Sequence, residues 1–214
     1  MPHEKTTLVY KYDELSDEAK AKARDKWRET ECTDNWWYEC VFDDACSVAA
    51  ILGITIDTRK VKLMGGGESS KPAIYFSGFS SQGDGACFEG IYAYAKGCRE
   101  KIREYAPVDS VLHCIADRLA ALQRKHFYRL EAIVKHTGHY CHSHSTSIDV
   151  FDRADQYGRD IGPSHGEVEE CLRRFMDWIY RQLERYFDYL MSDECIEESI
   201  KCNEVEFNED GGLA

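Results

Sequence analysis

Three features that mark other classes of protein are missing from this chain of 214 residues. No apolar run approaches the ~20 residues that a membrane-spanning helix needs. The opening residues, Met1 to Lys5, are polar and charged, unlike the apolar stretch of a signal peptide. Basic residues are outnumbered, with 27 Lys and Arg against 39 Asp and Glu, so the formal net charge is −12. Because this charge repels phosphate backbones, we expect no direct binding of duplex nucleic acid. From the missing apolar segments we expect no membrane partner and a cytoplasmic location.

Motifs of several enzyme and metal-site classes are absent as well. The chain has ten cysteines, but no two are spaced as Cys-x-x-Cys, and no His-Glu-x-x-His occurs. Neither a Gly-x-Ser-x-Gly nucleophile elbow nor a phosphate-binding P-loop is present. The scattered cysteines are therefore expected to be reduced, mostly buried side chains.

What the chain does contain is enough apolar and aromatic sequence for a folded core, at 43% hydrophobic and 12% aromatic residues. Helical periodicity is clearest after Ser164, which opens the longest predicted helix with capping-box spacing. We expect that helix to bury four residues of its apolar stripe, namely Leu172, Phe175, Ile179 and Leu183. An acidic helix and tail are predicted over 192–214.

Alternating patterns predict strands between the helices. The segments Tyr75–Tyr92 and Phe127–Val150 are expected to form hairpins of one central antiparallel sheet, the second with a tight turn at Thr137-Gly138. Pairs of helices between groups of neighbouring strands favour an α+β class over alternating βαβ units. We therefore predict a single α+β domain over 1–214, with helices packed on the sheet.

The segment Tyr75–Gly90 is unusually rich in glycine. Its four glycines suggest special backbone angles or a close approach by another chain or a ligand, because glycine is costly in regular structure. In one interpretation, backbone N–H groups between Ser80 and Gly85 bind a ligand or partner. In the other, this is only a tight turn in which Gln82 and Asp84 bond to their own backbone. The residues predicted to bind are Ser77, Phe79, Gln82, Gly83, Asp84, Gly85 and Phe88.

A second segment, His136–Ser145, holds half of the eight histidines. A turn at Thr137-Gly138 would place His136 opposite His139, with Cys141 on the same face of the strand. Two imidazoles and one thiolate can ligate Zn²⁺, although no fourth ligand is apparent. Zinc is the one cofactor that this pattern suggests.

The same register suggests a catalytic alternative on the other face of the hairpin. It places His144 opposite Glu131 and beside Arg129. A Glu–His pair next to an arginine is sufficient for acid–base cleavage of a phosphodiester. A slip of one residue removes this arrangement, and a solvated polar face is the competing interpretation.

Four blocks of the sequence resemble accessory proteins encoded by tailed bacteriophages and prophages, some of which carry a provisional antitoxin label. The most specific is the central block Tyr75–Gly90, which contains Ser77-Gly78-Phe79 and Gln82-Gly83-Asp84-Gly85. The others are Tyr10–Lys20, Val134–Val150 and Ser192–Gly211.

The resemblance implies a phage accessory protein that acts in the cytoplasm of the bacterial host. The leading hypothesis is a non-enzymatic inhibitor of antiviral defence that binds a host defence protein or its small nucleotide signal. An antitoxin-like neutralising protein and a small phosphodiester-cleaving enzyme are the alternatives.

Overall fold

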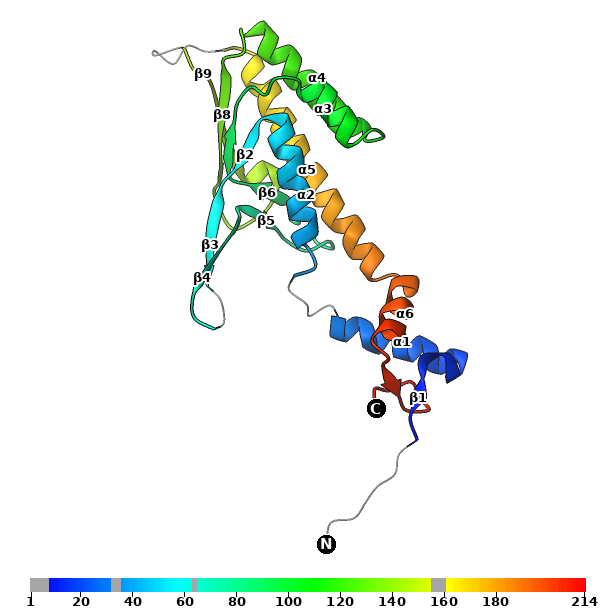
Figure 1. Cartoon of the computed structure of the whole chain (residues 1–214). Coiled ribbons are helices and arrows are strands. Elements are labelled where there is room, and N and C mark those ends of the chain that lie inside the picture. The colour runs from blue at the N-terminus through cyan, green and yellow to red at the C-terminus, as the bar shows by residue number, and fades with distance from the viewer. Residues whose placement is uncertain (1–7, 32–35, 63–64, 155–160) are drawn as a thin grey trace. The chain divides into compact units, whose positions relative to one another are not determined.

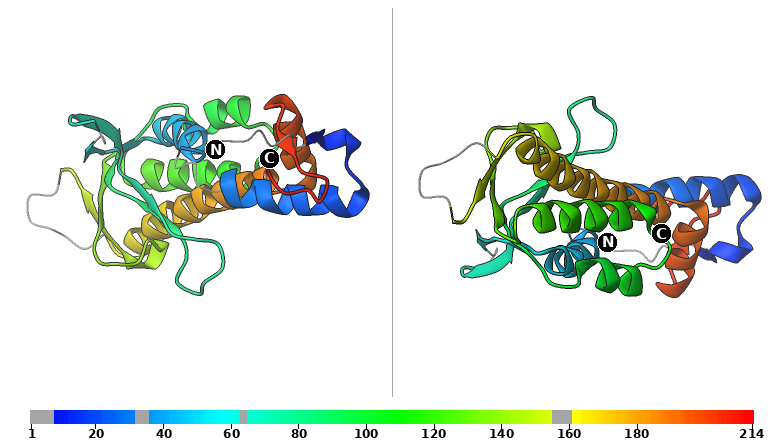
Figure 2. Two further views of the ribbon diagram at one scale, coloured as in Figure 1. Left: turned by 90° about the horizontal axis from the view of Figure 1, so that it is seen from below. Right: turned by 90° about the horizontal axis from the view of Figure 1, so that it is seen from above.

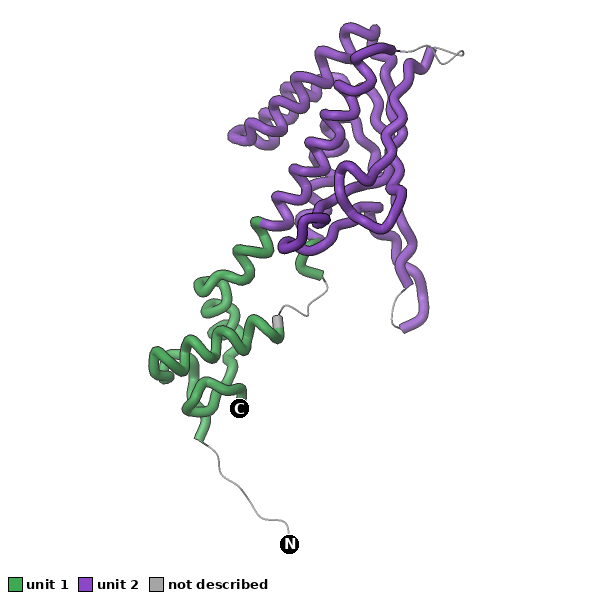
Figure 3. Tube along the Cα trace, turned by 180° about the vertical axis from the view of Figure 1, so that it is seen from behind, with its two compact units in different colours: residues 1–38, 185–214 green, residues 39–184 purple. Residues whose placement is uncertain are grey.

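The computed structural model describes residues 8–31, 36–62, 65–154 and 161–214. These residues form two compact units, one from 1–38 with 185–214 and the other from 39–184 (Figure 3). One domain can contain two such units, so the single-domain hypothesis stays a prediction. No helix in the described segments is long and apolar enough to span a membrane.

Unit 1 brings the first and last elements of the chain together. Strand β1 (Tyr10–Lys11) leads through η1 (Tyr12–Glu14) to helix α1 (Asp17–Glu31), while α6 (Asp193–Cys202) leads to β10 (Glu206–Phe207). β1 and β10 pair antiparallel. Among the described residues of this unit, the buried core consists of Tyr12, Leu15, Ala19, Ala23, Ile196, Ile200 and Phe207.

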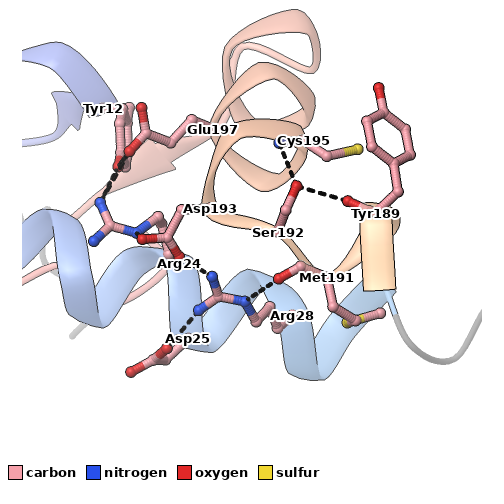
Figure 4. A network of polar contacts seen from close by, with 10 residues as sticks. All are labelled: Tyr12, Arg24, Asp25, Arg28, Tyr189, Met191, Ser192, Asp193, Cys195 and Glu197. Atoms are coloured by element: carbon pink, nitrogen blue, oxygen red, sulfur yellow. Dashed lines mark hydrogen bonds and ion pairs between the residues drawn. The ribbon is translucent and has the colours of Figure 1, made fainter. Parts of the chain in front are cut away.

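Two arginines of α1 hold α6 in this unit (Figure 4). Arg24 forms ion pairs with Asp193 and Glu197 at 3.4 and 3.0 Å. Arg28 also pairs with Asp193 and donates a hydrogen bond of 3.0 Å to the Met191 carbonyl oxygen. Two carboxylates of the acidic C-terminal segment are thus paired with arginines within the unit.

Unit 2 is built on a four-stranded antiparallel sheet in the order β2-β7-β8-β9. Its strands are β2 (Ile54–Ile56), β7 (Gly90–Tyr92), β8 (Leu130–His136) and β9 (Thr146–Asp152). Residues of alternate positions, such as Val134 opposite Ile148 and Ala132 opposite Val150, are buried on one face. Helices α2 (Glu39–Leu52), α4 (Ser110–Lys125) and α5 (Ser164–Leu190) lie on one side of the sheet (Figure 1).

The long helix confirms the periodicity argument. Leu172, Phe175, Ile179 and Leu183 of α5 are all fully buried. α5 runs beside α4 (Figure 2), where Arg118 pairs with Glu167 and Trp178 donates to Asp109. Helix α3 (Cys98–Tyr105) packs against α4 through ion pairs of Arg99 and Arg103 with Asp117. The α+β class is therefore confirmed.

Three strand pairs branch from one point in unit 2. Asp57, Ala73 and Glu89 form a closed ring of backbone hydrogen bonds: Asp57 donates to Glu89, Glu89 to Ala73 and Ala73 to Asp57, at 2.7–2.9 Å. Beyond this ring β3 (Thr58–Lys62) pairs with β4 (Glu68–Pro72) as a protruding arm (Figure 1). β5 (Ile74–Phe76) pairs with β6 (Ala86–Phe88) as a separate hairpin. The prediction that all of Tyr75–Tyr92 belongs to the central sheet is thus wrong in detail. The chain changes partner at Glu89: β6 before it pairs with β5, whereas β7 after it pairs with β2 and β8 in the central sheet.

Candidate functional site

The glycine-rich and histidine-rich segments lie against each other. The first is the connection Ser77–Gly85 between β5 and β6, and the second is the connection Thr137–Ser145 between β8 and β9. A Cβ added at Gly85 would lie 3.0 Å from both the Cys141 carbonyl oxygen and the His142 Cα. We call these two connections together the joined loop surface.

Close contacts within this chain explain why glycine occupies several of these positions. None of Gly78, Gly83, Gly85 and Gly90 has φ in the left-handed region, so the expectation of special backbone angles is wrong for them. A close approach is present, but the approaching groups belong to this chain. A Cβ at Gly90 would lie 2.2 Å from the Thr55 carbonyl oxygen, and a Cβ at Gly83 would lie 3.4 Å from the Tyr140 ring.

Asp84 organises the glycine-rich connection from inside. Its Oδ2 accepts hydrogen bonds from the N–H groups of Ser80 and Ser81 at 2.9 and 2.6 Å. The Ser77 N–H donates to the Gly85 carbonyl oxygen at 3.1 Å and closes the base of the loop. For Asp84 the tight-turn interpretation therefore describes the geometry, and the two N–H groups already have an acceptor.

The aromatic residues predicted beside this loop have different environments. Phe79 is half-buried, with its ring centroid 5.6 Å from that of Tyr180. Phe88 is fully buried and packs edge-on against Phe175, so its assignment to the binding surface is wrong. Gln82 and Gly83 are exposed. The accessible part of this connection is its tip.

The hairpin that carries the histidines has a different register from the predicted one. His136 pairs with Thr146, and Glu131 pairs with Phe151. The predicted turn at Thr137-Gly138 is therefore wrong, because the chain continues to Ser145 before the second strand starts. A register that pairs Val134 with Ile148 buries both side chains, whereas the predicted turn places Cys141 opposite Val134.

The zinc hypothesis loses its predicted geometry with this register. In the described part of the chain, no three His, Cys, Asp or Glu side chains are grouped so that they could hold a metal ion. His136 Nε2 lies 3.1 Å from the Tyr140 carbonyl oxygen, and His139 packs against the Tyr140 ring. Burial raises the pKa of the Cys141 and Cys87 thiols, and that of Cys87 rises to about 12. The thiolate form that ligates metals or attacks electrophiles is thus disfavoured.

The catalytic candidates are not brought together either. Glu131 forms an ion pair with Arg153 at 3.5 Å, and Arg129 pairs with Asp152 at 2.9 Å. His144 lies in η2 (Ser143–Ser145), beyond the opposite end of β8. From Glu131 to His136 a strand advances about 17 Å, so His144 cannot share a proton with Glu131.

Instead, the histidine-rich connection is held as a short 3-10 turn. The His144 N–H donates to His142 Nδ1 at 3.1 Å, and the two rings stack with centroids 5.3 Å apart. The Ser145 hydroxyl donates to the His142 carbonyl oxygen at 2.8 Å. From α5, Arg173 donates to the carbonyl oxygens of Ser143 and Thr146 while paired with Glu169.

A polar cluster at the base of the joined loop surface includes residues that no sequence motif marks. The Tyr75 hydroxyl donates to Glu89 Oε2 at 2.9 Å, and Glu89 Oε1 accepts the His136 N–H at 3.3 Å. The rings of Tyr75 and His136 are 5.0 Å apart, and the Arg59 guanidinium lies 5.0 Å from the Tyr75 ring. Burial and the Glu89 carboxylate raise the pKa of Tyr75, so it stays a neutral donor. Arg59 and Arg173 come from distant segments, and no spacing in the sequence connects them to these loops.

We expect the glycine-rich connection to loosen in acid. The N–H groups of Ser81 and Ser80 hold the pKa of Asp84 below its usual value. Such a carboxylate stabilises the fold above its ordinary pKa of about 3.9, and this stabilisation is lost as the pH falls through the lowered value. Amide exchange at Ser80 and Ser81 should therefore accelerate below about pH 4 relative to exchange in α5. Asp84→Asn should show faster exchange already at neutral pH and no such acid transition; the same profile in both proteins would refute the role of Asp84.

Comparison with known proteins gives a family but no activity. Residues 37–193 match the model of a family described as a domain of unknown function, DUF8835. No curated protein and no solved structure matches the chain. The matched residues contain all of unit 2, including the joined loop surface. Since the match covers more than half of the sequence, the chain belongs to the DUF8835 family.

Proposed function

We propose that this is a phage-encoded binding protein which neutralises a host antiviral defence system by binding one of its protein components in the bacterial cytoplasm. The proposed contact is the joined loop surface, residues 77–85 and 137–145. The observation that carries this proposal is that two connections far apart in sequence form one exposed surface with a fixed backbone.

The tips of both connections present side chains suited to contact with a protein. Gln82, His139 and His144 are exposed, and Tyr140 is 65% exposed. Tyrosine is enriched among the residues that dominate protein–protein binding energy. Since Asp84, Ser145 and Arg173 already hold the backbone, less conformational entropy is lost when a partner binds.

A protein partner is favoured over a nucleotide at this surface because of the local hydrogen bonding. The N–H groups of Ser80 and Ser81, which a phosphate would need, already bond to Asp84, whose negative charge would oppose a phosphate. Binding is favoured over acid–base catalysis because Glu131 and Arg129 have other partners. The net charge of −12 supports a basic partner surface.

The proposal is tested by capture from lysates of phage-infected host cells. The tagged double variant Gln82→Ala/Tyr140→Ala should retain its melting temperature, because both side chains are exposed. It should capture the partner about tenfold less than the unchanged protein does. Tyr105→Ala on α3 is the matched control, since Tyr105 is 47% exposed and lies outside the joined loop surface.

On a host that carries the defence system, the double variant should also protect phage less than the unchanged protein and the Tyr105→Ala control do. Equal capture and equal protection by the double variant and the control would contradict the proposed surface. Rescue of growth against a toxin encoded by an adjacent gene, with no effect on phage plating, would instead establish the antitoxin alternative.

A further inference from the structure

In the turn after α4, two consecutive non-glycine residues have backbone angles in the left-handed region. Phe127 and Tyr128 have φ of 55° and 63°. This conformation is unfavourable for residues other than glycine, because Cβ crowds the following carbonyl oxygen. Strained backbone of this kind persists only where the surrounding structure enforces it, and it is concentrated at functional sites.

The enforcing group is the buried side chain of Gln123 on α4. Its Nε2 donates to the Leu130 carbonyl oxygen at 2.7 Å and to the Tyr92 hydroxyl at 3.1 Å, while its Oε1 accepts the Leu130 N–H at 3.2 Å. The Tyr128 N–H donates to the Gln123 carbonyl oxygen at 2.6 Å. One residue thus fastens the turn to both the helix and the sheet.

The turn displays aromatic rings at the surface instead of burying them. Phe127 is 75% exposed and Tyr128 is 46% exposed. The Tyr128 ring packs at 4.6 Å, centroid to centroid, on Tyr94, which follows β7 and is itself 40% exposed. We call the pair Tyr94 and Tyr128 the tyrosine platform.

A small pocket of about 130 Å³ lies beside the tyrosine platform. Both tyrosines line it, together with Arg99, Glu100 and Arg124. Arg99 is paired with Asp117, whereas the Arg124 guanidinium has no hydrogen bond or ion pair with the residues that the structure describes. The pocket therefore offers one unengaged cation next to two aromatic rings.

Most residues that line the pocket belong to a segment whose net charge is opposite to that of the whole chain. Residues 96–135 contain nine basic and five acidic side chains, whereas the net charge of the protein is −12. The segment that carries Arg124 and Tyr128 is thus suited to attract an anion. Glu100 limits that charge, which favours a ligand with one phosphate over one with several.

We propose that the tyrosine platform and Arg124 bind a nucleoside monophosphate, with the base on the rings and the phosphate at Arg124. Tyrosine rings stack with nucleobases, and the planar arginine side chain pairs with phosphate. The pocket is smaller than the ~300–1,000 Å³ of typical ligand pockets, so part of the ligand lies outside it on the exposed rings. This site is at the opposite end of β8 from the joined loop surface and goes beyond the proposed function.

The test is calorimetric titration of the full chain with AMP, GMP, CMP and UMP at low salt. At least one monophosphate should bind about tenfold more tightly than its nucleoside or inorganic phosphate does, because base and phosphate contacts combine. Tyr128→Asn and Arg124→Gln should each weaken that binding about tenfold. Asparagine is chosen because it tolerates the left-handed backbone, which keeps the turn folded.

Arg118→Gln, an exposed arginine on the same helix, is the matched control and should bind as the unchanged protein does. Unaltered melting temperatures would show that the variants are folded. Absence of binding by all four monophosphates, equal binding by all variants, or binding of oligonucleotides alone would each overturn the proposal. The joined loop variants should bind the nucleotide normally, so this test and that of the proposed function can fail independently.

Discussion

Replacing Arg173 by methionine is expected to lower the free energy of unfolding by about 2–3 kcal/mol and to release the connection 137–145. The guanidinium is mostly buried and binds two carbonyl oxygens as well as Glu169. Methionine keeps the aliphatic packing but leaves the carbonyl oxygens of Ser143 and Thr146 and the Glu169 carboxylate without their donor. Urea unfolding gives the free energy, and hydrogen exchange of residues 137–146 reports the local release.

The neighbouring arginine provides the control for this prediction. Arg174 contacts only the Cys114 sulfur, at 3.4 Å, among the hydrogen bonds and ion pairs of the described residues. Arg174→Met should therefore change stability by no more than about 0.5 kcal/mol. If Arg173→Met has the same free energy of unfolding and the same hydrogen exchange at residues 137–146 as this control, α5 does not anchor the histidine-rich connection.

Truncation of Phe175 to alanine is expected to have the largest effect on stability, about 3–5 kcal/mol. Phe175 is fully buried and stacks on Trp178, with ring centroids 5.8 Å apart, while Phe88 meets it edge-on. The change removes a buried contact between the β5–β6 hairpin and α5 and leaves a cavity between them. The midpoint of urea unfolding measures the loss.

Asp177→Ala, at an exposed position of the same helix, should stay within about 0.5 kcal/mol of the unchanged protein. A Phe175→Ala protein as stable as Asp177→Ala would mean that α5 does not form the core under the sheet.

The sequence predicts the helices better than the strand pairings, and α5 shows why. A 3.6-residue period repeated over many turns identifies a buried stripe without knowledge of its partner. To predict strand pairing, the partner segment must be known. At Thr137-Gly138 the local turn signal favoured a two-residue hairpin, whereas burial of Ile148 and Val150 required a longer connection. The alternating apolar residues of the second strand were the better guide to register.

The sequence predicts that the glycine-rich segment shares a contact surface with the polar face of the neighbouring hairpin, but it does not predict the contacts that join the two. The density of glycines and histidines drew attention to residues 77–85 and 137–145. Nothing in the spacing reveals that Gly85 is required by the Cys141 backbone, or that Arg173 reaches the second loop from α5. These contacts join residues far apart in the chain, and a single sequence records each residue without its neighbour in space.

The backbone ring of Asp57, Ala73 and Glu89 makes the β3–β4 arm a separable insertion. Its two ends, Asp57 and Ala73, are already bonded to each other before the arm begins. Shortening or lengthening the arm therefore leaves the alignment of β2, β5 and β7 intact, because the backbone hydrogen bonds of the ring do not depend on the arm. The fold can accept length variation, or a grafted reporter sequence, between Thr58 and Pro72 at little cost to the rest of unit 2.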